Sequence, residues 1–363
     1  QLVQQFTNQY AFLRELIQNS IDAGTKRVDV WFEFEPFEGG CMGAMRLHVD
    51  DTGEGMNREI IDTQLTRLFS SSKENDLTKI GKFGIGFVSV FALSPEAVVV
   101  DTSRDGENWR ILFHGKDKKF ERIMLDQPVD GTQVQLIKMV SPEDYEKHRY
   151  ESKRTITYWC KHCDVDIYVD NERINQPFTL NGPHVMTHQV PGTELVVAPA
   201  DGPKPFYGFY NRGLTLVESV ERDDPNDRQD HPPGIHFKIK SRYLEHTLTR
   251  DNILRDENYH KAMTILRSFV DGPFRKALFQ AALETGEDAV FGYLTHRLQG
   301  LPEDLANKPL LPLVEGGRLT LKQLKTAVDK QGEVFYEEQD SALTQSLKSQ
   351  GKIVLKWAGP ERE

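Results

Sequence analysis

The sequence predicts an α+β protein whose N-terminal part is an α/β sandwich, with helices over a mostly antiparallel sheet. Three observations predict this fold class. Residues Gln9–Ala23 have the apolar spacing of a helix, Val28–Phe34 alternate with the period of a strand, and four strand-like runs follow one another between Ala97 and Lys138. One helical layer beside such a succession of strands differs from the strand–helix alternation of a parallel doubly wound fold.

The first helix is expected over Gln9–Ala23 because Leu13, Leu16 and Ile17 fall on one side at helical spacing. Gly24 follows, and a glycine commonly ends a helix. The other elements of this domain are assigned from their apolar periods. We expect helices over Asn57–Leu68, Ile85–Phe91 and Ser141–Lys161, and strands over Met45–Val49, Ala97–Asp101, Trp109–His114, Phe120–Leu125, Thr132–Lys138 and Val165–Val169.

A chain of 363 residues is too long for one ordinary compact core, so more than one domain is expected. The segment Pro177–Pro183 marks the boundary, which predicts a first domain over residues 1–178 and a second, α/β domain over residues 179–363. Strand-like runs and the helical stretch Tyr259–Leu283 form the first part of the second domain, about residues 179–295. Helix and strand patterns alternate in residues 296–363, which predicts a small α/β/α unit there.

The formal net charge is −10. This balance makes nucleic acid an unexpected partner, because proteins that bind a duplex usually present a basic face. No apolar run has membrane-spanning length and no secretory signal is seen, so we expect a cytoplasmic protein with no membrane partner. Cys160 and Cys163 have the spacing of half a zinc site, but Cys41 is the one other cysteine, so two ordinary cysteines at a helix end are the better interpretation.

Three polar residues of the first helix, Glu15, Asn19 and Asp22, are spaced four and three residues apart. On a helix they share one face, opposite the apolar stripe. A carboxylate at Glu15 can take a proton from water, and an amide oxygen at Asn19 is a hard ligand of the kind that Mg²⁺ prefers. A solvated helix face is the alternative, and for this segment alone it is the better one.

A second segment, Asp50-Asp-Thr-Gly-Glu-Gly-Met56, places a carboxylate at the end of a strand before two glycines. The Asp51 carboxylate can accept a hydrogen bond from an exocyclic amine. Gly53 and Gly55 let a flat base approach the backbone closely. An acidic β-turn is the alternative interpretation.

A third segment, Ile80-Gly-Lys-Phe-Gly-Ile-Gly-Phe87, carries three glycines that lead directly into a helix. Backbone N–H groups at such a helix start can bind phosphates. The spacing is that of neither a Walker A loop nor a dinucleotide fingerprint, and a flexible hinge is the alternative. A fourth segment, Asp130-Gly-Thr132, opens a late strand, where Thr132 could hydrogen-bond adenine or its water, and a plain turn is the alternative.

Taken together and in this order, the four segments resemble the GHKL ATPase superfamily, which has the Bergerat fold. The superfamily includes the 90-kDa heat-shock chaperones, type II topoisomerase ATPase subunits, MutL-type repair proteins and sensor histidine kinases. The resemblance covers about the first half of the chain and implies binding and hydrolysis of ATP to ADP with Mg²⁺. It makes Glu15 the general base and Asn19 the Mg²⁺ ligand, and it implies an ATP-binding set of Asn19, Asp22, Asp51, Gly53, Gly55, Met56, Lys73, Gly81, Lys82, Phe83, Gly84, Ile85, Gly86, Phe87 and Thr132.

Within the superfamily, Phe12–Ile17 and Ile80–Phe91 are most similar to the 90-kDa heat-shock form. Tyr207–Leu216 resembles the strand pair of the chaperone middle domain. His246–Leu254 resembles its catalytic-loop segment, whose arginine reaches the γ-phosphate of ATP, a catalytic role that falls on Arg250. The resemblance therefore implies a divergent, bacterial heat-shock protein of the stress response, with an ATP-binding domain followed by a middle domain.

Other segments depart from the chaperone pattern. Asp22–Val30 passes quickly from helix to strand, as in MutL-type proteins, and Phe69–Lys73 lacks the usual chaperone spacing of the lid, which is expected over Ser70–Lys82. No charged interdomain linker is seen. A C-terminal dimerisation domain is expected to lie outside this chain, so a homodimer would form through regions beyond it.

Three functions remain open from the sequence. The first is a chaperone-like clamp that ATP closes around a protein client or effector. The second is a DNA-acting ATPase of the MutL or MORC kind, favoured by the short helix-to-strand link. The third is a nucleotide-gated scaffold that binds ATP and turns little of it over.

Overall fold

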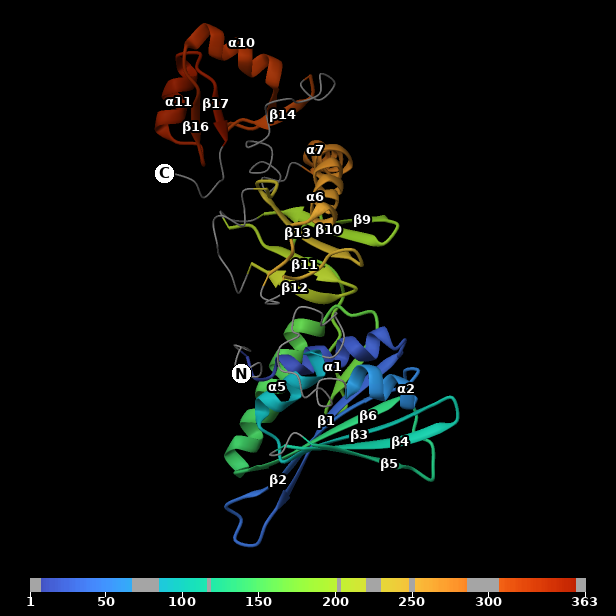
Figure 1. Ribbon diagram of the computed structural model, residues 1–363. Coiled ribbons are helices and arrows are strands. Elements are labelled where there is room, and N and C mark those ends of the chain that lie inside the picture. Colours follow the sequence, from blue (N-terminus) through green and yellow to red (C-terminus); the bar gives the residue numbers. More distant parts are fainter. Residues whose placement is uncertain are drawn as a thin grey trace. The chain divides into compact units, whose positions relative to one another are not determined.

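The computed structural model describes residues 8–66, 85–115, 119–200, 204–219, 230–247, 252–285 and 307–356 (Figure 1). The chain divides into two compact units. The first comprises Gln1–Pro177 with Arg212–Thr215, and the second comprises Phe178–Asn211 with Leu216–Glu363. Each unit is described by itself.

The first unit is built on an eight-stranded sheet in the order β5-β4-β3-β6-β2-β1-β7-β8. All neighbouring strands are antiparallel except β1 and β7, which are parallel. The strands are β1 (Arg27–Pro36), β2 (Gly43–Asp51), β3 (Ala97–Arg104), β4 (Glu107–His114), β5 (Phe120–Met124), β6 (Thr132–Val140), β7 (Asp166–Val169) and β8 (Glu172–Arg173). The sheet is therefore mostly antiparallel, as the sequence predicts.

Helices cover one face of this sheet, as Figure 1 shows for α1 (Ala11–Asp22) and α5 (Pro142–Cys160). The apolar side of α1 is buried, with Leu13 and Ile17 at 0% exposure. Alternate residues of β1, including Val28 and Val30, face the same core. Helix α5 begins at Ser141, whose side chain accepts a hydrogen bond from the N–H of Asp144.

Two helical segments depart from regular α-geometry. The predicted helix Asn57–Leu68 is described as α2 (Arg58–Ile60) followed by a π-helical turn over Ile61–Leu65. The predicted helix Ile85–Phe91 is described as α4 (Ile85–Val88) followed by a 3₁₀ turn over Ser89–Leu93. Such short irregular helices depend on their packing partners, which a helical period does not reveal.

The second unit contains a five-stranded sheet in the order β12-β11-β13-β10-β9. A buried apolar cluster joins this sheet to α6 and the helical turns that follow it. The predicted single helix Tyr259–Leu283 is interrupted by a π turn that contains Pro273, because proline cannot donate a backbone hydrogen bond. The elements are β9 (Met186–Val190), β10 (Thr193–Pro199), β11 (Tyr207–Asn211), β12 (Leu214–Glu218), β13 (Ile235–Ser241), α6 (Glu257–Phe269), the π turn Val270–Phe274 and α7 (Arg275–Thr285).

The end of the second unit holds two small two-stranded sheets. One is antiparallel, with β14 (Pro309–Pro312) and β15 (Arg318–Thr320), and the other is parallel, with β16 (Phe335–Glu337) and β17 (Val354–Lys356). Helices α10 (Leu321–Gln331) and α11 (Ala342–Ser349) each begin with a capping box. The combination of helices with large, mainly antiparallel sheets confirms the predicted α+β class.

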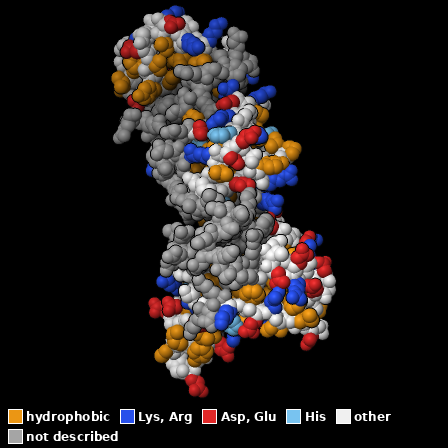
Figure 2. All heavy atoms as spheres, viewed as in Figure 1, with side chains coloured by type: hydrophobic (Ala, Val, Ile, Leu, Met, Phe, Trp, Pro, Cys, Tyr) orange, Lys and Arg blue, Asp and Glu red, His pale blue; other side chains and the backbone are white. Residues whose placement is uncertain are grey.

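Acidic and basic side chains are intermixed over the coloured part of the surface in Figure 2. Within the ranges given above, no helix combines the length and the apolar character needed to cross a membrane. Cys41 is exposed, Cys160 and Cys163 are buried, and all three are free thiols.

Candidate functional site

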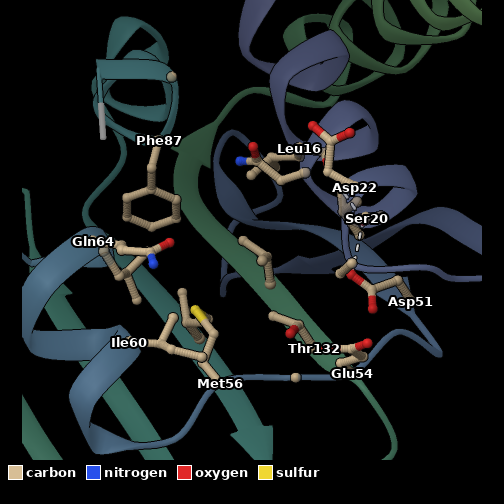
Figure 3. A pocket seen from close by; sticks show the side chains of 18 of the residues that line it. Leu16, Ser20, Asp22, Asp51, Glu54, Met56, Ile60, Gln64, Phe87 and Thr132 are labelled. Carbon is tan, nitrogen blue, oxygen red and sulfur yellow. Dashed lines mark hydrogen bonds between the residues drawn. The ribbon is translucent and has the colours of Figure 1, made fainter. Parts of the chain in front are cut away.

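A cavity of about 320 Å³ lies in the first unit, which is within the size range of small-molecule sites. Its walls come from α1, the segment from the end of β2 to the π turn, α4, and the inner faces of β3 and β6 (Figure 3). The lining residues are Glu15, Leu16, Asn19, Ser20, Asp22, Ala23, Val49, Asp51, Glu54, Gly55, Met56, Ile60, Gln64, Leu65, Gly86, Phe87, Val100, Arg104, Thr132 and Val134.

The structure brings nine of the predicted site residues to this one cavity. They come from all four sequence segments and are Glu15, Asn19, Asp22, Asp51, Gly55, Met56, Gly86, Phe87 and Thr132. Gly53 does not line the cavity; its N–H donates to Asp51 Oδ1 at 2.8 Å. Six predicted residues lie outside the described ranges, and their roles stay predictions: Lys73, Gly81, Lys82, Phe83, Gly84 and Arg250. The role of Ile85 also stays a prediction, because its side chain is not described.

The wall of the cavity that α1 forms carries three polar residues, Glu15, Asn19 and Asp22. The Glu15 side chain is buried, with 6% of the residue exposed, and a Cβ added at Gly86 would lie 2.7 Å from its Oε2. Asp22 is partly exposed, and burial raises the pKa of its carboxyl, while Arg212 at 3.2 Å acts in the opposite direction. Helical spacing and the packing of α1 on the sheet thus aim two carboxylates and the Asn19 amide at one space.

The end of β2 places Asp51 in the cavity wall. Asp51 is buried, with 9% of the residue exposed. Its two carboxylate oxygens accept hydrogen bonds from different donors. The Gly53 N–H donates to Oδ1 and the Ser20 hydroxyl donates to Oδ2, each at 2.8 Å; Figure 3 shows the second bond. Thr132 lies opposite Asp51 in the β2–β6 ladder. This part of the wall offers a buried acceptor beside a hydroxyl, which suits a ligand with an exocyclic amine.

Two glycines near Asp51, Gly55 and Gly131, lie so close to neighbouring backbone that neither position has room for a side chain. Gly55 has φ +67°, and a Cβ there would lie 2.2 Å from the carbonyl oxygen of Ser103. Gly131 has φ +62°, and a Cβ there would lie 2.2 Å from the carbonyl oxygen of Asp51. Glycine is required at both positions because both the conformation and the space exclude a side chain.

Several lining residues escape sequence reasoning. Ser20 stands in the N-terminal motif but was not predicted to act. Gln64 and Leu65 reach the cavity from the π turn, and Figure 3 shows Gln64 across the cavity from Asp51. Arg104 comes from the end of β3, where its Nη2 lies 2.9 Å from Glu54 Oε2. The π turn marks Gln64 as a candidate, because such turns are frequent at functional sites. The sequence does not show this turn, so Gln64 could not be predicted from it.

The residues of this cavity fit a nucleotide and Mg²⁺. The Asn19 amide and the Glu15 and Asp22 carboxylates supply hard oxygen atoms along the α1 wall of the cavity. The described residues contain no cluster of three or more His, Cys, Asp or Glu that could hold a metal by themselves. This donor set suits Mg²⁺, which commonly takes one or two protein oxygens and completes its coordination with water and substrate phosphates.

Comparison with known proteins agrees with the geometry. Residues 9–145 match the family described as histidine kinase-, DNA gyrase B-, and HSP90-like ATPase. Curated relatives named "Chaperone protein HtpG" are 28% identical over 197 residues in Ehrlichia ruminantium (strain Gardel) and 30% identical over 193 residues in Anaplasma phagocytophilum (strain HZ).

Each of these two alignments covers 46% of this chain and 30% of the relative, so the chain matches less than a third of their length. A similar protein of Wolbachia pipientis wMel is 29% identical over 194 residues. These matches confirm the resemblance to the superfamily and to its heat-shock chaperone branch that the motifs predict. Residues 9–145 of this chain are therefore similar to the ATPase domain of the histidine kinase-, DNA gyrase B-, and HSP90-like family.

Proposed function

We propose that the first unit binds ATP in this cavity and hydrolyses it, as the motor of a heat-shock-type molecular chaperone. One observation supports this most strongly: a buried carboxylate acceptor, Asp51, and a buried carboxylate, Glu15, line the same cavity. The adenine amine is assigned to Asp51, and the phosphates are assigned to the part of the wall formed by Glu15, Asn19 and Gly86.

In this mechanism Glu15 accepts a proton from the water that attacks the γ-phosphate, so a hydroxide-like nucleophile forms as the P–O bond to ADP breaks. Bound Mg²⁺, held through Asn19, would neutralise phosphate charge. The Glu15 side chain is buried, which keeps it in one place beside the cavity. Arg250 is retained as the proposed partner of the γ-phosphate.

Steady-state ATPase assays test the proposal. Glu15→Ala should lower kcat by about 100-fold or more while ADP affinity is kept, since a positioned base contributes about 10²–10⁴-fold. Glu59→Ala, an exposed carboxylate on α2 that does not line the cavity, is the control and should retain the wild-type rate. Full Mg²⁺-dependent activity in Glu15→Ala would refute the assigned mechanism, and unaltered hydrolysis in Arg250→Ala would remove Arg250 from it.

The chaperone role is proposed from the HtpG relatives and is tested separately. The chain should suppress aggregation of an unfolded client in an ATP-dependent manner, and a homodimer formed through further regions would act as the clamp. Turnover stimulated by duplex DNA and reduced by salt would instead favour the MutL or MORC kind of ATPase. Tight ATP binding with no measurable chemical step in single-turnover experiments would favour a scaffold.

A further inference from the structure

The Ser20 hydroxyl makes a contact that the assigned mechanism does not use. Ser20 lies on α1, is 4% exposed, and donates to Asp51 Oδ2 at 2.8 Å, with the Leu16 carbonyl oxygen at 3.1 Å as a second acceptor. A hydroxyl has one proton, and the shorter bond to a charged acceptor is the stronger of the two. The hydroxyl therefore fixes the position of one Asp51 oxygen from the helix side.

The state of Asp51 depends on its donors. Burial raises the pKa of its carboxyl, Asp130 raises it further, and the bonds from Gly53, Ser20 and Thr132 lower it. Asp50 lies beside it in β2 and interacts with it unfavourably. A protonated carboxyl would place an O–H on one oxygen and lose the acceptor that an amine needs.

Four other charged groups line the same cavity, of which Glu15 is the proposed base. Asp22 and Glu54 are acidic, and Arg104 forms an ion pair with Glu54 at 2.9 Å. Arg104 is held in this ion pair with Glu54. The described hydrogen bonds to the Asp51 side chain come from neutral donors. Each carboxylate oxygen has two lone pairs, so the three bonds from Gly53, Ser20 and Thr132 leave acceptor capacity for a ligand.

We infer that Ser20 is a specificity-determining residue: by holding Asp51 as an oriented acceptor, it makes the cavity prefer a purine that carries an exocyclic amine. This inference rests on the proposed function, because it requires the nucleotide base beside Asp51. Ser20 acts through Asp51 and is therefore a positioning residue. Loss of the hydroxyl removes one of the three hydrogen bonds that the carboxylate accepts, the one from a side chain, and it favours the protonated form.

Two diphosphates that are not hydrolysed provide the test: ADP, and purine riboside 5′-diphosphate, which lacks the exocyclic amine. Dissociation constants are measured by calorimetry for the wild-type chain, Ser20→Ala and Asp51→Asn. The wild-type chain should prefer ADP by roughly 10- to 100-fold, the range expected for a hydrogen bond to a charged group. Ser20→Ala should lose most of that preference while its affinity for purine riboside 5′-diphosphate stays within about twofold.

Ser152→Ala is the matched control. Ser152 is a buried serine of α5 whose Oγ has no hydrogen-bond partner among the described residues, and it does not line the cavity. This variant should keep the wild-type preference. In a double-mutant cycle, Ser20→Ala should have little further effect on Asp51→Asn, because the two residues act as one unit.

The outcomes separate the inference from the proposed function. Binding of neither diphosphate to the wild-type chain would refute the nucleotide cavity itself. An unchanged preference in Ser20→Ala, with the preference lost in Asp51→Asn, would overturn only the role of Ser20, and so would an equal loss of affinity for both ligands. If Ser20→Ala does not fold, the nearly isosteric Ser20→Cys, whose thiol is a weaker donor, should show an intermediate preference; a wild-type preference there would overturn the inference.

Discussion

The carboxylate of Glu15 lies against the α-carbon of Gly86, so close that an added Cβ would come within 2.7 Å of Oε2. Gly86 belongs to α4 and Glu15 to α1, and both line the cavity. This contact limits the positions that the Glu15 carboxylate, the proposed base, can occupy. A side chain at position 86 would meet the far end of a movable glutamate rather than rigid backbone, so it would displace the carboxylate without breaking the fold.

Gly86→Ala should therefore reduce kcat for ATP hydrolysis by about tenfold or more, because a displaced base loses its reach to water. The melting temperature should stay close to that of the wild-type chain, since alanine favours a helix by about 1 kcal/mol over glycine. Steady-state kinetics and thermal melting measure the two effects. Gly272→Ala, where an added Cβ meets nothing within 4 Å, is the control. An unchanged kcat would show that Glu15 is not confined by Gly86.

Gly55→Ala should destabilise the cavity and abolish measurable ADP binding. The variant combines a positive φ of +67° with a Cβ placed 2.2 Å from the Ser103 carbonyl oxygen, so the backbone must move. Gly24→Ala is a matched control, because Gly24 has φ +75° but open space around its Cβ position. We expect a loss of about 1–3 kcal/mol in the free energy of unfolding at Gly24 from φ strain alone, and more at Gly55. Equal losses in urea denaturation would contradict the steric argument.

The outer face of the sheet carries a row of carboxylates. Asp50 on β2 lies directly opposite Asp29 on β1, and Gln133 on β6 separates it from Asp101 on β3. The outer two carboxylates are each 2.6 Å from an arginine, Arg27 or Arg110, whereas no ion pair holds Asp50 within the described residues. Burial, followed by repulsion from Asp51, Asp29 and Asp101, raises the pKa of Asp50 to about 7.

A pKa raised by folding means that ionisation of Asp50 opposes folding. This loss of stability begins as pH rises above the ordinary value of 3.8 and is complete above about 7. Asp50→Asn should therefore be more stable than the wild-type chain at pH 8, by about 1–2 kcal/mol after discounting for solvent screening. The difference should vanish near pH 4. Urea denaturation at both pH values measures it, and Asp101→Asn, which breaks the pair with Arg110, should give no gain.

Base recognition should depend on pH through Asp51. Because burial raises its pKa above the ordinary value of 3.8, the carboxyl takes up a proton as pH falls toward that raised pKa and then loses its acceptor. The ratio of the affinities for ADP and purine riboside 5′-diphosphate should fall together with pH. Protonation of the phosphates affects both ligands and cancels in the ratio. A ratio that does not change between pH 8 and pH 4, in a chain that stays folded, would place the amine elsewhere.

The features that the sequence determined are local ones. The spacing of Glu15, Asn19 and Asp22 predicts a shared helix face because the helical period depends only on neighbouring residues. Period-two runs predict the strands for the same reason. The motif order then predicts the family, and the family match and the fold class agree with it. These conclusions needed no knowledge of which strands pair.

The tertiary structure decided which groups meet across the sequence. The Ser20–Asp51 bond joins residues 31 positions apart, and it exists because α1 packs over the end of β2. The place of Gln64 in the cavity depends on a π turn that its packing partners stabilise. Strand order put Asp50 between Asp29 and Asp101, a row that no local pattern shows. Periodicity reports on one element at a time, whereas hydrogen bonds and repulsion between elements arise only when the chain is folded.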